Sequence, residues 1–190
     1  MPRSPRDLGP RILAAAHDAG GCNAVAPVLK ELAARRMPLS IFADGPSYEL
    51  LSKQALDVQR LELEEAGTRV GPLFDSCQPK LIVVGNSCGP SLEDRFVVEA
   101  RKRKGPSVGI LDSWLLYDRR FSDGTDPWAF LPDTLVVMDT TAKNDMVGLG
   151  APPERLLPLG QPQFDQLQIR GKAFGEATRQ SVRASLGVPS

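Results

Sequence analysis

The stretch from residue 11 to residue 24 reads RILAAAHDAGGCNA and decides the fold of this chain. A short apolar run ends at His17 and Asp18, then Gly20 and Gly21 turn the backbone, and an amphipathic helix pattern follows. Apolar residues of that pattern recur at i, i+3, i+4 and i+7: Val25, Val28, Leu29 and Leu32. The stretch therefore predicts a strand, a tight turn and a helix. This is the opening half of a βαβ unit, in which ligands bind beyond the carboxyl end of the strand.

Strand and helix patterns keep alternating along the rest of the chain. Further strands are predicted at residues 39–43, 57–61, 80–84, 107–111, 134–138 and 156–159. Helices are predicted at residues 48–55, 70–77, 139–147 and 171–186, and one more after an N-cap at Ser91, with Leu92, Phe96 and Ala100 on its buried face. This alternation predicts an α/β fold: a Rossmann-like, doubly wound, mainly parallel sheet with helices on both faces, in three layers.

The composition is that of an ordinary globular domain. The 190 residues are 42% hydrophobic and 24% charged, with a formal net charge of +0. A net charge of zero provides no excess of positive charge for binding nucleic acid, so no nucleic-acid partner is predicted. The one basic cluster, at residues 101–104, closes a predicted helix, where cations suit the helix dipole.

Cysteine spacing and the amino-terminal residues predict where the protein works. Cys22, Cys77 and Cys88 form neither a disulfide framework nor a CxxC metal pair, which favours a reducing cytosol. Residues 1–10 are rich in Pro and Arg and are expected to be a disordered lead-in. No apolar run is long enough for a signal peptide or a membrane span. We therefore expect a cytoplasmic protein, with peripheral membrane contact left open.

Residues 112–133, DSWLLYDRRFSDGTDPWAFLPD, interrupt the alternation of strands and helices. Loops of this length are uncommon inside compact domains and are usually functional or disordered. This one carries both tryptophans, Trp114 and Trp128, whereas disordered segments are poor in aromatic residues. We therefore expect an ordered lip at the carboxyl edge of the sheet.

His17 and Asp18 are candidate functional residues because they follow the first strand. Histidine commonly acts as a general base near neutral pH. The alternative is a histidine that caps the sheet edge by a backbone hydrogen bond. Gly20 and Gly21 would let a ligand approach backbone N–H groups at a helix start. HDAGGCNA is not GxGxxG, so Asp44, at about the distance of a ribose-binding acid, makes only a weak case for a dinucleotide.

Polar residues also follow two later strands. Asn86 and Ser87 come after one, and Asp112, Ser113 and Trp114 come after the next. In a parallel sheet both groups share an edge with His17. A carboxylate beside an aromatic ring suits a sugar, because the ring stacks on C–H faces and the carboxylate accepts hydroxyl hydrogens. The alternative is that the tryptophans pin the long loop to the body.

Several segments together resemble the amino-terminal half of glycosyltransferases with the GT-B fold, and also the related sugar-nucleotide 2-epimerases. The segments are HDAGGCNAVAPVLKEL, GNSCGPSLEDR, ILDSW, VVMDTTAKNDM and GQPQFDQL, and the similarity covers roughly residues 11–186. The most useful marker is G-x-P-x-x-D at residues 160–165, which in that fold lies at the crossing between two Rossmann-like domains. Gln161 of this marker is a further predicted substrate-binding residue.

The resemblance implies an acceptor-side half of a glycosyltransferase that binds a small-molecule acceptor. Its donor substrate would be a nucleotide-sugar, with no metal and no other cofactor. It implies a Rossmann-like domain at 11–165, then a helix and linker at 166–190 toward a donor-binding domain, in cis or as a separate subunit, without which the chain is inactive. His17 matches the position of a catalytic base, and Asp112 competes for that role. Two alternatives stay open: a non-catalytic sugar- or nucleotide-binding module, or a 2-epimerase fragment.

Overall fold

The computed structural model describes residues 11–188, apart from the side chains of Arg170 and Ala173. Seven strands form a single sheet in the order β3-β2-β1-β4-β5-β6-β7, and every neighbouring pair is parallel. The strands are β1 (Ile12–Ala16), β2 (Leu39–Ala43), β3 (Val58–Arg60), β4 (Leu81–Val84), β5 (Ser107–Ile110), β6 (Thr134–Val137) and β7 (Leu156–Pro158). The predicted doubly wound parallel sheet is confirmed, and the predicted lead-in at 1–10 lies outside the described residues.

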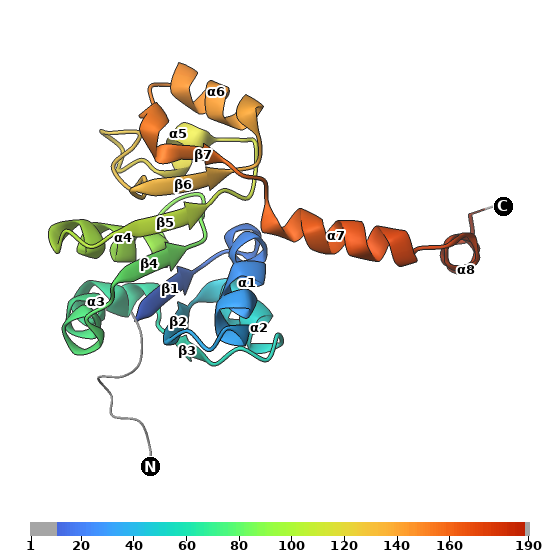
Figure 1. Cartoon of the computed structure of the whole chain (residues 1–190), viewed down its shortest axis with the longest axis horizontal. Helices are drawn as coiled ribbons and strands as arrows, with labels where there is room; N and C mark the ends of the chain where they lie inside the picture. Colours follow the sequence, from blue (N-terminus) through green and yellow to red (C-terminus); the bar gives the residue numbers. More distant parts are fainter. Residues whose placement is uncertain (1–10, 189–190) are drawn as a thin grey trace, which may run out of the picture.

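Helices cover both faces of this sheet (Figure 1). They are α1 (Ala19–Ala34), α2 (Gly45–Ser52), α3 (Leu63–Cys77), α4 (Leu92–Lys102), α5 (Tyr117–Arg120), α6 (Thr140–Gly148), α7 (Pro162–Ala173) and α8 (Glu176–Ser185). One core packs α1 and α2 against β1 and β2, and a second packs α3 and α4 against the other face. A third core holds α6 and the long loop against β6 and β7. No helix within residues 11–188 is long and apolar enough to cross a membrane.

Alternation of side chains along β1 explains the two main cores. Ile12, Ala14 and Ala16 face α1, whereas Leu13 and Ala15 face α4. All five residues are buried, which is the pattern of a central parallel strand covered on both faces. The small alanines let α1 and α4 pack closely against the central strand β1. The candidate site residues follow the carboxyl ends of this strand and its neighbours.

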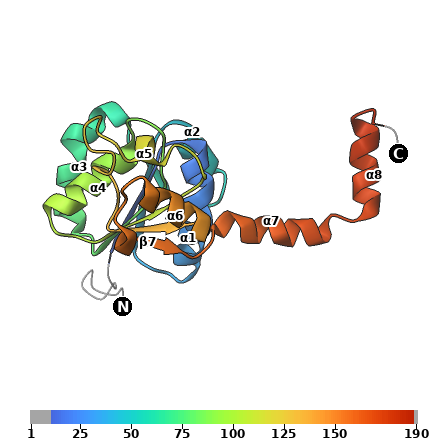
Figure 2. The ribbon, with the colours of Figure 1, turned by 90° about the horizontal axis from the view of Figure 1, so that it is seen from above.

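Three predicted helices have different bounds. The helix predicted at 48–55 begins at Gly45, because Asp44 is extended and Pro46 suits the first turn. The helix predicted at 70–77 begins at Leu63, and its exposed first turn carries Glu64 and Glu65. The single helix predicted at 171–186 covers only the end of α7 and all of α8, and the two helices are separated at Phe174 and Gly175. α7 projects from the body past α1, and α8 lies beyond it (Figures 1 and 2).

The long loop at 112–133 is folded onto the body of the protein. It contains the short helix α5, and Tyr117, Phe121 and Leu131 are buried in the third core. Trp128 packs against that core with its ring centroid 6.3 Å from that of Phe121. Trp128 therefore pins the loop, as the structural alternative proposed, whereas Trp114 remains 42% exposed.

Candidate functional site

The carboxyl ends of β1, β4 and β5 bring most of the predicted site residues to one edge of the sheet. Asp18 follows β1, Asn86 and Ser87 follow β4, and Asp112 follows β5. Asp18 is the N-cap of α1, and its Oδ1 accepts the N–H of Gly21 at 2.8 Å. The carboxylate that begins α1 is therefore held at the helix terminus, where the helix dipole stabilises negative charge.

Two glycines let the first turn of α1 touch the β4–α4 turn; Gly20 and Gly21, predicted to form a tight turn, lie inside α1 instead. A Cβ placed on Gly21 would collide with the main chain of Asn86, and one on Gly85 would lie 2.7 Å from the carbonyl oxygen of Gly21. Each position therefore requires glycine for close backbone approach. Gly21 serves this internal contact, whereas Gly20 faces the Asp112 carboxylate, with which a Cβ would collide.

Asp112 lies at the centre of a polar network. Its Oδ1 pairs with Nη1 of Arg120 at 2.7 Å, and the same Nη1 donates to Oδ1 of Asn86 at 3.0 Å. Nδ2 of Asn86 in turn donates to the carbonyl oxygen of Ile110 at 3.2 Å. Burial raises the pKa of the Asp112 carboxyl, Arg120 opposes that rise, and the nearby Asp18 charge adds to it. Arg120 was not predicted, because it sits inside a loop without a helical period.

The His17 side chain points to another part of the edge. Its Nδ1 lies 3.8 Å from Oδ2 of Asp44, beside Gly45 at the start of α2. That Asp44 oxygen also accepts the N–H of Leu63 at 2.9 Å. None of the interactions described for residues 11–188 joins the side chains of His17 and Asp112. The two predicted candidates for the catalytic base therefore occupy separate positions on the edge.

The main chain of the His17 turn is tied down by hydrogen bonds. The His17 N–H donates to Oε1 of Glu93 at 3.0 Å, and its carbonyl accepts the N–H of Ser47 at 3.2 Å. The imidazole is not part of these bonds, and its buried Nδ1 has no hydrogen-bond partner among the described residues. The edge-capping alternative therefore holds for the backbone of His17 but not for its ring nitrogen Nδ1.

Trp114 and Gln161 connect this edge to α7. Nε1 of Trp114 donates to Oδ2 of Asp139 at 3.0 Å, and its ring stacks on Phe164 of α7 with centroids 5.8 Å apart. Nε2 of Gln161 donates to the Asp112 carbonyl at 2.8 Å. Ser113 is half-buried between Asp112 and Trp114. One side of the Trp114 ring is thus already covered by protein.

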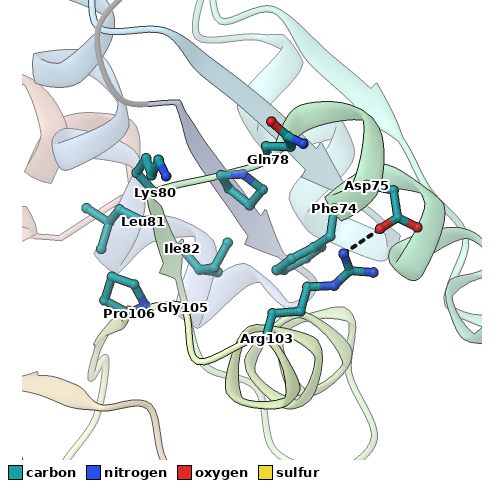
Figure 3. A pocket seen from close by; sticks show the side chains of 10 residues that line it. Phe74, Asp75, Gln78, Lys80, Leu81, Ile82, Arg103, Gly105 and Pro106 are labelled. Carbon is teal, nitrogen blue, oxygen red and sulfur yellow. Dashed lines mark hydrogen bonds and ion pairs between the residues drawn. The ribbon is translucent and has the colours of Figure 1, made fainter.

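Two cavities of about 390 Å³ lie away from His17 and Asp112, although the predicted site residue Gln161 lines one of them. One is at the amino end of β4, where Arg103 pairs with Asp75 beside Phe74, and Lys80 is another of its lining residues (Figure 3). The other lies between α1, the face of β4 to β6, and the start of α7. None of the predicted catalytic residues lines either cavity. In residues 11–188, no group of three or more His, Cys, Asp or Glu side chains is placed to hold a metal ion.

Comparison with solved structures identifies the architecture. The UDP-GlcNAc 2-epimerase from Neisseria meningitidis, bound to UDP-GlcNAc, matches with a TM-score of 0.63 and 14% identity. The Methanocaldococcus jannaschii enzyme, in complex with UDP-GlcNAc and UDP, matches with a TM-score of 0.64 and 13% identity. Both matches cover 92% of this chain and 53% of the other. This chain has the fold of about half a UDP-GlcNAc 2-epimerase.

The resemblance inferred from the motifs is confirmed at the level of fold. MurG from Acinetobacter baumannii also matches, with a TM-score of 0.52 and 10% identity over 68% of this chain and 42% of that one. The chain thus spans about half the length of the solved proteins that it matches. No protein-family model and no curated protein matches the sequence.

Proposed function

We propose that this chain forms the acceptor-side wall of a cleft in a GT-B-like glycosyltransferase that uses a nucleotide-sugar donor. The observation that carries the proposal is the convergence of Asp18, Asn86 and Asp112 at the carboxyl ends of β1, β4 and β5. In open α/β sheets, ligands bind outside the carboxyl ends of the strands. The fold similarity to UDP-GlcNAc 2-epimerases and MurG supports nucleotide-sugar chemistry as the setting.

The chemistry of these residues suits a polyhydroxylated ligand. Carboxylates accept hydroxyl hydrogens, and Asp112 has Oδ1 fixed by Arg120 while its Oδ2 faces Gly20. Oδ1 of Asp18 lies 3.6 Å from the position of a Cβ on Gly20, so both carboxylates gather at this glycine. We propose that the sugar acceptor binds at this edge beside the Asp112 carboxylate, which itself fills the space over Gly20. A donor-binding domain, in cis or as a separate subunit, would supply the facing wall.

The proposed base is His17 or Asp112. His17 has an unpartnered Nδ1 near Asp44, the kind of carboxylate that orients a catalytic imidazole. Asp112 lies nearer the proposed acceptor position, and its raised pKa brings its proton affinity closer to neutral pH. In the proposed arrangement, Asp112 orients the acceptor and His17 takes the proton.

The second candidate is a half of a sugar-nucleotide 2-epimerase. The similarity to epimerase structures, with TM-scores of 0.63 and 0.64 against 0.52 for MurG, favours it. In that case the same carboxylates would act on the sugar of the nucleotide-sugar itself. The two candidates differ in whether a free sugar binds this chain.

The test is an NMR titration of the ¹⁵N-labelled chain with N-acetylglucosamine and, separately, with UDP. The acceptor-side proposal expects the free sugar to shift amide signals at residues 17–21, 85–87 and 112–114. Asp112→Asn should weaken that binding, whereas Asp75→Asn, at the opposite end of the sheet, should leave it unchanged. Binding of UDP without binding of the free sugar would favour the epimerase candidate. Shifts confined to other surfaces would contradict both.

A further inference from the structure

The helices of the described chain cover one half of the sheet on one face only. From β1 the sheet extends to β2 and β3 on one side, and to β4, β5, β6 and β7 on the other. Because connections between parallel strands are right-handed, α1 and α2 lie on one face, whereas α3, α4 and α6 lie on the opposite face. Within residues 11–188, the α1 face of β5 to β7 is therefore left without a crossover helix.

The side chains of these strands show the missing cover. Along β6, Leu135 and Val137 are buried in the third core, whereas Val136 between them is only half-buried. Val108 of β5 is also half-buried, and Leu157 of β7, which pairs in register with Val136, is 40% exposed. Parallel sheets normally have both faces covered. This apolar face is therefore a surface that a further element should cover.

The uncovered face is the floor of an apolar groove. The cavity of about 390 Å³ between α1, the sheet and the start of α7 lies over it. This cavity adjoins a space of about 430 Å³ between α1 and α7, with which it shares Val28, Pro162 and Asp165 among its lining residues. Leu159, which also lines the cavity, is 72% exposed. The groove thus has the length and apolar lining that suit an amphipathic helix.

Helix α8 lacks the packing that a helix of its length needs. All ten of its residues are exposed, and α7 carries it away from the body (Figure 2). Isolated helices shorter than about 12–15 residues are marginal in water. Thr178, Val182 and Leu186 fall at i, i+4 and i+8, so they share one side of α8, and the last two are 42% and 72% exposed. This side of α8 is available to enter an apolar groove.

The charges of α8 and of the groove margin have opposite signs. The charged residues of α8 are two arginines and one acid, Arg179, Arg183 and Glu176. The charged residues of the groove margin are two acids and one arginine, Glu31, Asp165 and Arg35. The helix is thus net positive and the margin net negative, which favours their association.

The direction of α7 indicates that the helix in the groove comes from a second copy of the chain. α7 begins at the groove margin and has 12 residues, which span about 18 Å at 1.5 Å per residue, so α8 begins well away from its own groove. Two α7 helices packed side by side and antiparallel would bring the end of each next to the start of the other. Each α8 would then lie at the groove of the other copy. Leu167, in the middle of α7 and 52% exposed, would lie at the two-fold axis.

We propose that α8 of each copy docks in the apolar groove of the other, in a two-fold symmetric dimer with exchanged arms. Val182 and Leu186 pack on the uncovered face of β5 to β7, and the arginines of α8 lie beside Glu31 and Asp165 at the margin. Exchange of an identical element between copies forms a dimer without any newly shaped surface. This inference does not depend on the proposed function.

The first test measures the mass of the full chain by sedimentation as a function of concentration. The wild type should form a dimer. Val182→Asp on α8 and Leu159→Glu in the groove should each raise the dissociation constant by at least about tenfold, because a charge replaces an apolar contact. Both residues are exposed in the single copy, so neither change disturbs its core.

Leu149→Glu is the matched control. Leu149 is 53% exposed and follows α6, and it does not line the groove. Its replacement should leave the dissociation constant unchanged. A wild type that stays monomeric at every concentration, or a dimer weakened equally by all three variants, would overturn the proposal.

The second test separates exchange between copies from docking of α8 within its own copy. Asp165→Lys and Arg179→Glu each place like charges on the helix and the margin, so each variant alone should dimerise more weakly at low ionic strength. In an equal mixture of the two, the heterodimer has one wild-type interface and one with both charges reversed. Dimerisation of the mixture should therefore recover toward that of the wild type. A mixture that dimerises no better than either variant alone would overturn the exchange of α8.

Discussion

At the scale of single residues, the site depends on charges held in partly or fully buried positions. Arg120 is the clearest case, because it joins Asp112 to Asn86 with both members of the ion pair about one-tenth exposed. Asp112 could be predicted from its place after a strand. Arg120 could not, because its approach to Asp112 depends on how the long loop folds.

Removing the Arg120 guanidinium should therefore destabilise the folded protein. Arg120→Met leaves the Asp112 carboxylate without its cation, which we expect to lower the free energy of unfolding by about 3 kcal/mol. Arg69→Met is the matched control, since Arg69 pairs with Glu65 at the same 2.7 Å but both side chains are half exposed. Its cost should be below about 1 kcal/mol. Denaturant unfolding measures both, and equal losses would contradict the burial argument.

Glu93 gives a prediction about stability and pH. Its pKa is about 8 in the folded protein against 4.5 as the ordinary value, so the folded state keeps a proton that the unfolded state releases. Stability from this group is full below about pH 4.5 and is lost as the pH rises through 8. Each pKa unit corresponds to about 1.4 kcal/mol, which limits the total loss to about 5 kcal/mol.

Replacing the carboxyl by an amide should remove that loss. We expect Glu93→Gln to be more stable than the wild type near pH 9, with the difference shrinking toward pH 5. Asp94→Asn provides the comparison, because the pKa of Asp94 is raised to about 6 and its gain should level off above that pH. Thermal or denaturant unfolding across this pH range measures both profiles. A pH-independent difference for Glu93→Gln would count against a buried proton.

At the scale of elements, the β1–α1 and β4–α4 turns form one packed unit. A break between a buried strand and a helix was predicted here and is confirmed, but Gly20 and Gly21 do not form the turn, because α1 begins at Ala19 and both glycines lie in its first turn. The interpretation of both glycines as room for substrate was incomplete, because Gly21 faces the main chain of Asn86. Gly21 and Asn86 are 65 residues apart, so local sequence patterns do not predict their contact. The break between α7 and α8 was missed for a related reason, since apolar spacing continues across Gly175.

Two glycine substitutions separate this contact from simple helix propensity. Gly21→Ala should destabilise the protein by about 3 kcal/mol, because its Cβ collides with rigid backbone. Gly67→Ala lies in α3 with no atom within 4 Å of the new Cβ, and should stabilise by up to about 1 kcal/mol. Circular dichroism melts of the two variants would show opposite shifts in Tm. A neutral Gly21→Ala would mean that the two turns can separate freely.

At the scale of the whole molecule, the chain accounts for about half of the proteins whose fold it shares. Alternating strands and helices were enough to predict the sheet, because the period of apolar residues records which faces are covered. The residues of the candidate site come from distant segments of the chain, which the fold brings together at the carboxyl edge of the sheet. The proposed transfer of the proton to His17 rather than Asp112 is therefore tested together with the proposed donor-binding domain.

In a preparation that combines this chain with the proposed donor-binding domain, His17→Ala should lower turnover by about 10²–10⁴-fold if the imidazole is the base. The folded state should survive, because the hydrogen bonds at this position come from the backbone. Steady-state kinetics with a saturating donor measures the effect. Unchanged turnover would exclude His17 as the base and assign that role to Asp112.

The stacking of Trp114 on Phe164 links the orientation of α7 to an indole ring at the edge of the sheet. Gln161, directly before α7, donates a hydrogen bond to the Asp112 carbonyl. A rotation of α7 relative to the sheet would therefore displace Asp112, which follows β5. The same rotation would separate the Trp114 ring from Phe164 and change the fluorescence emission of Trp114. Trp128 lies in the packed part of the loop and contributes a constant background. Intrinsic fluorescence of Trp114 would therefore report the angle between α7 and the rest of the domain.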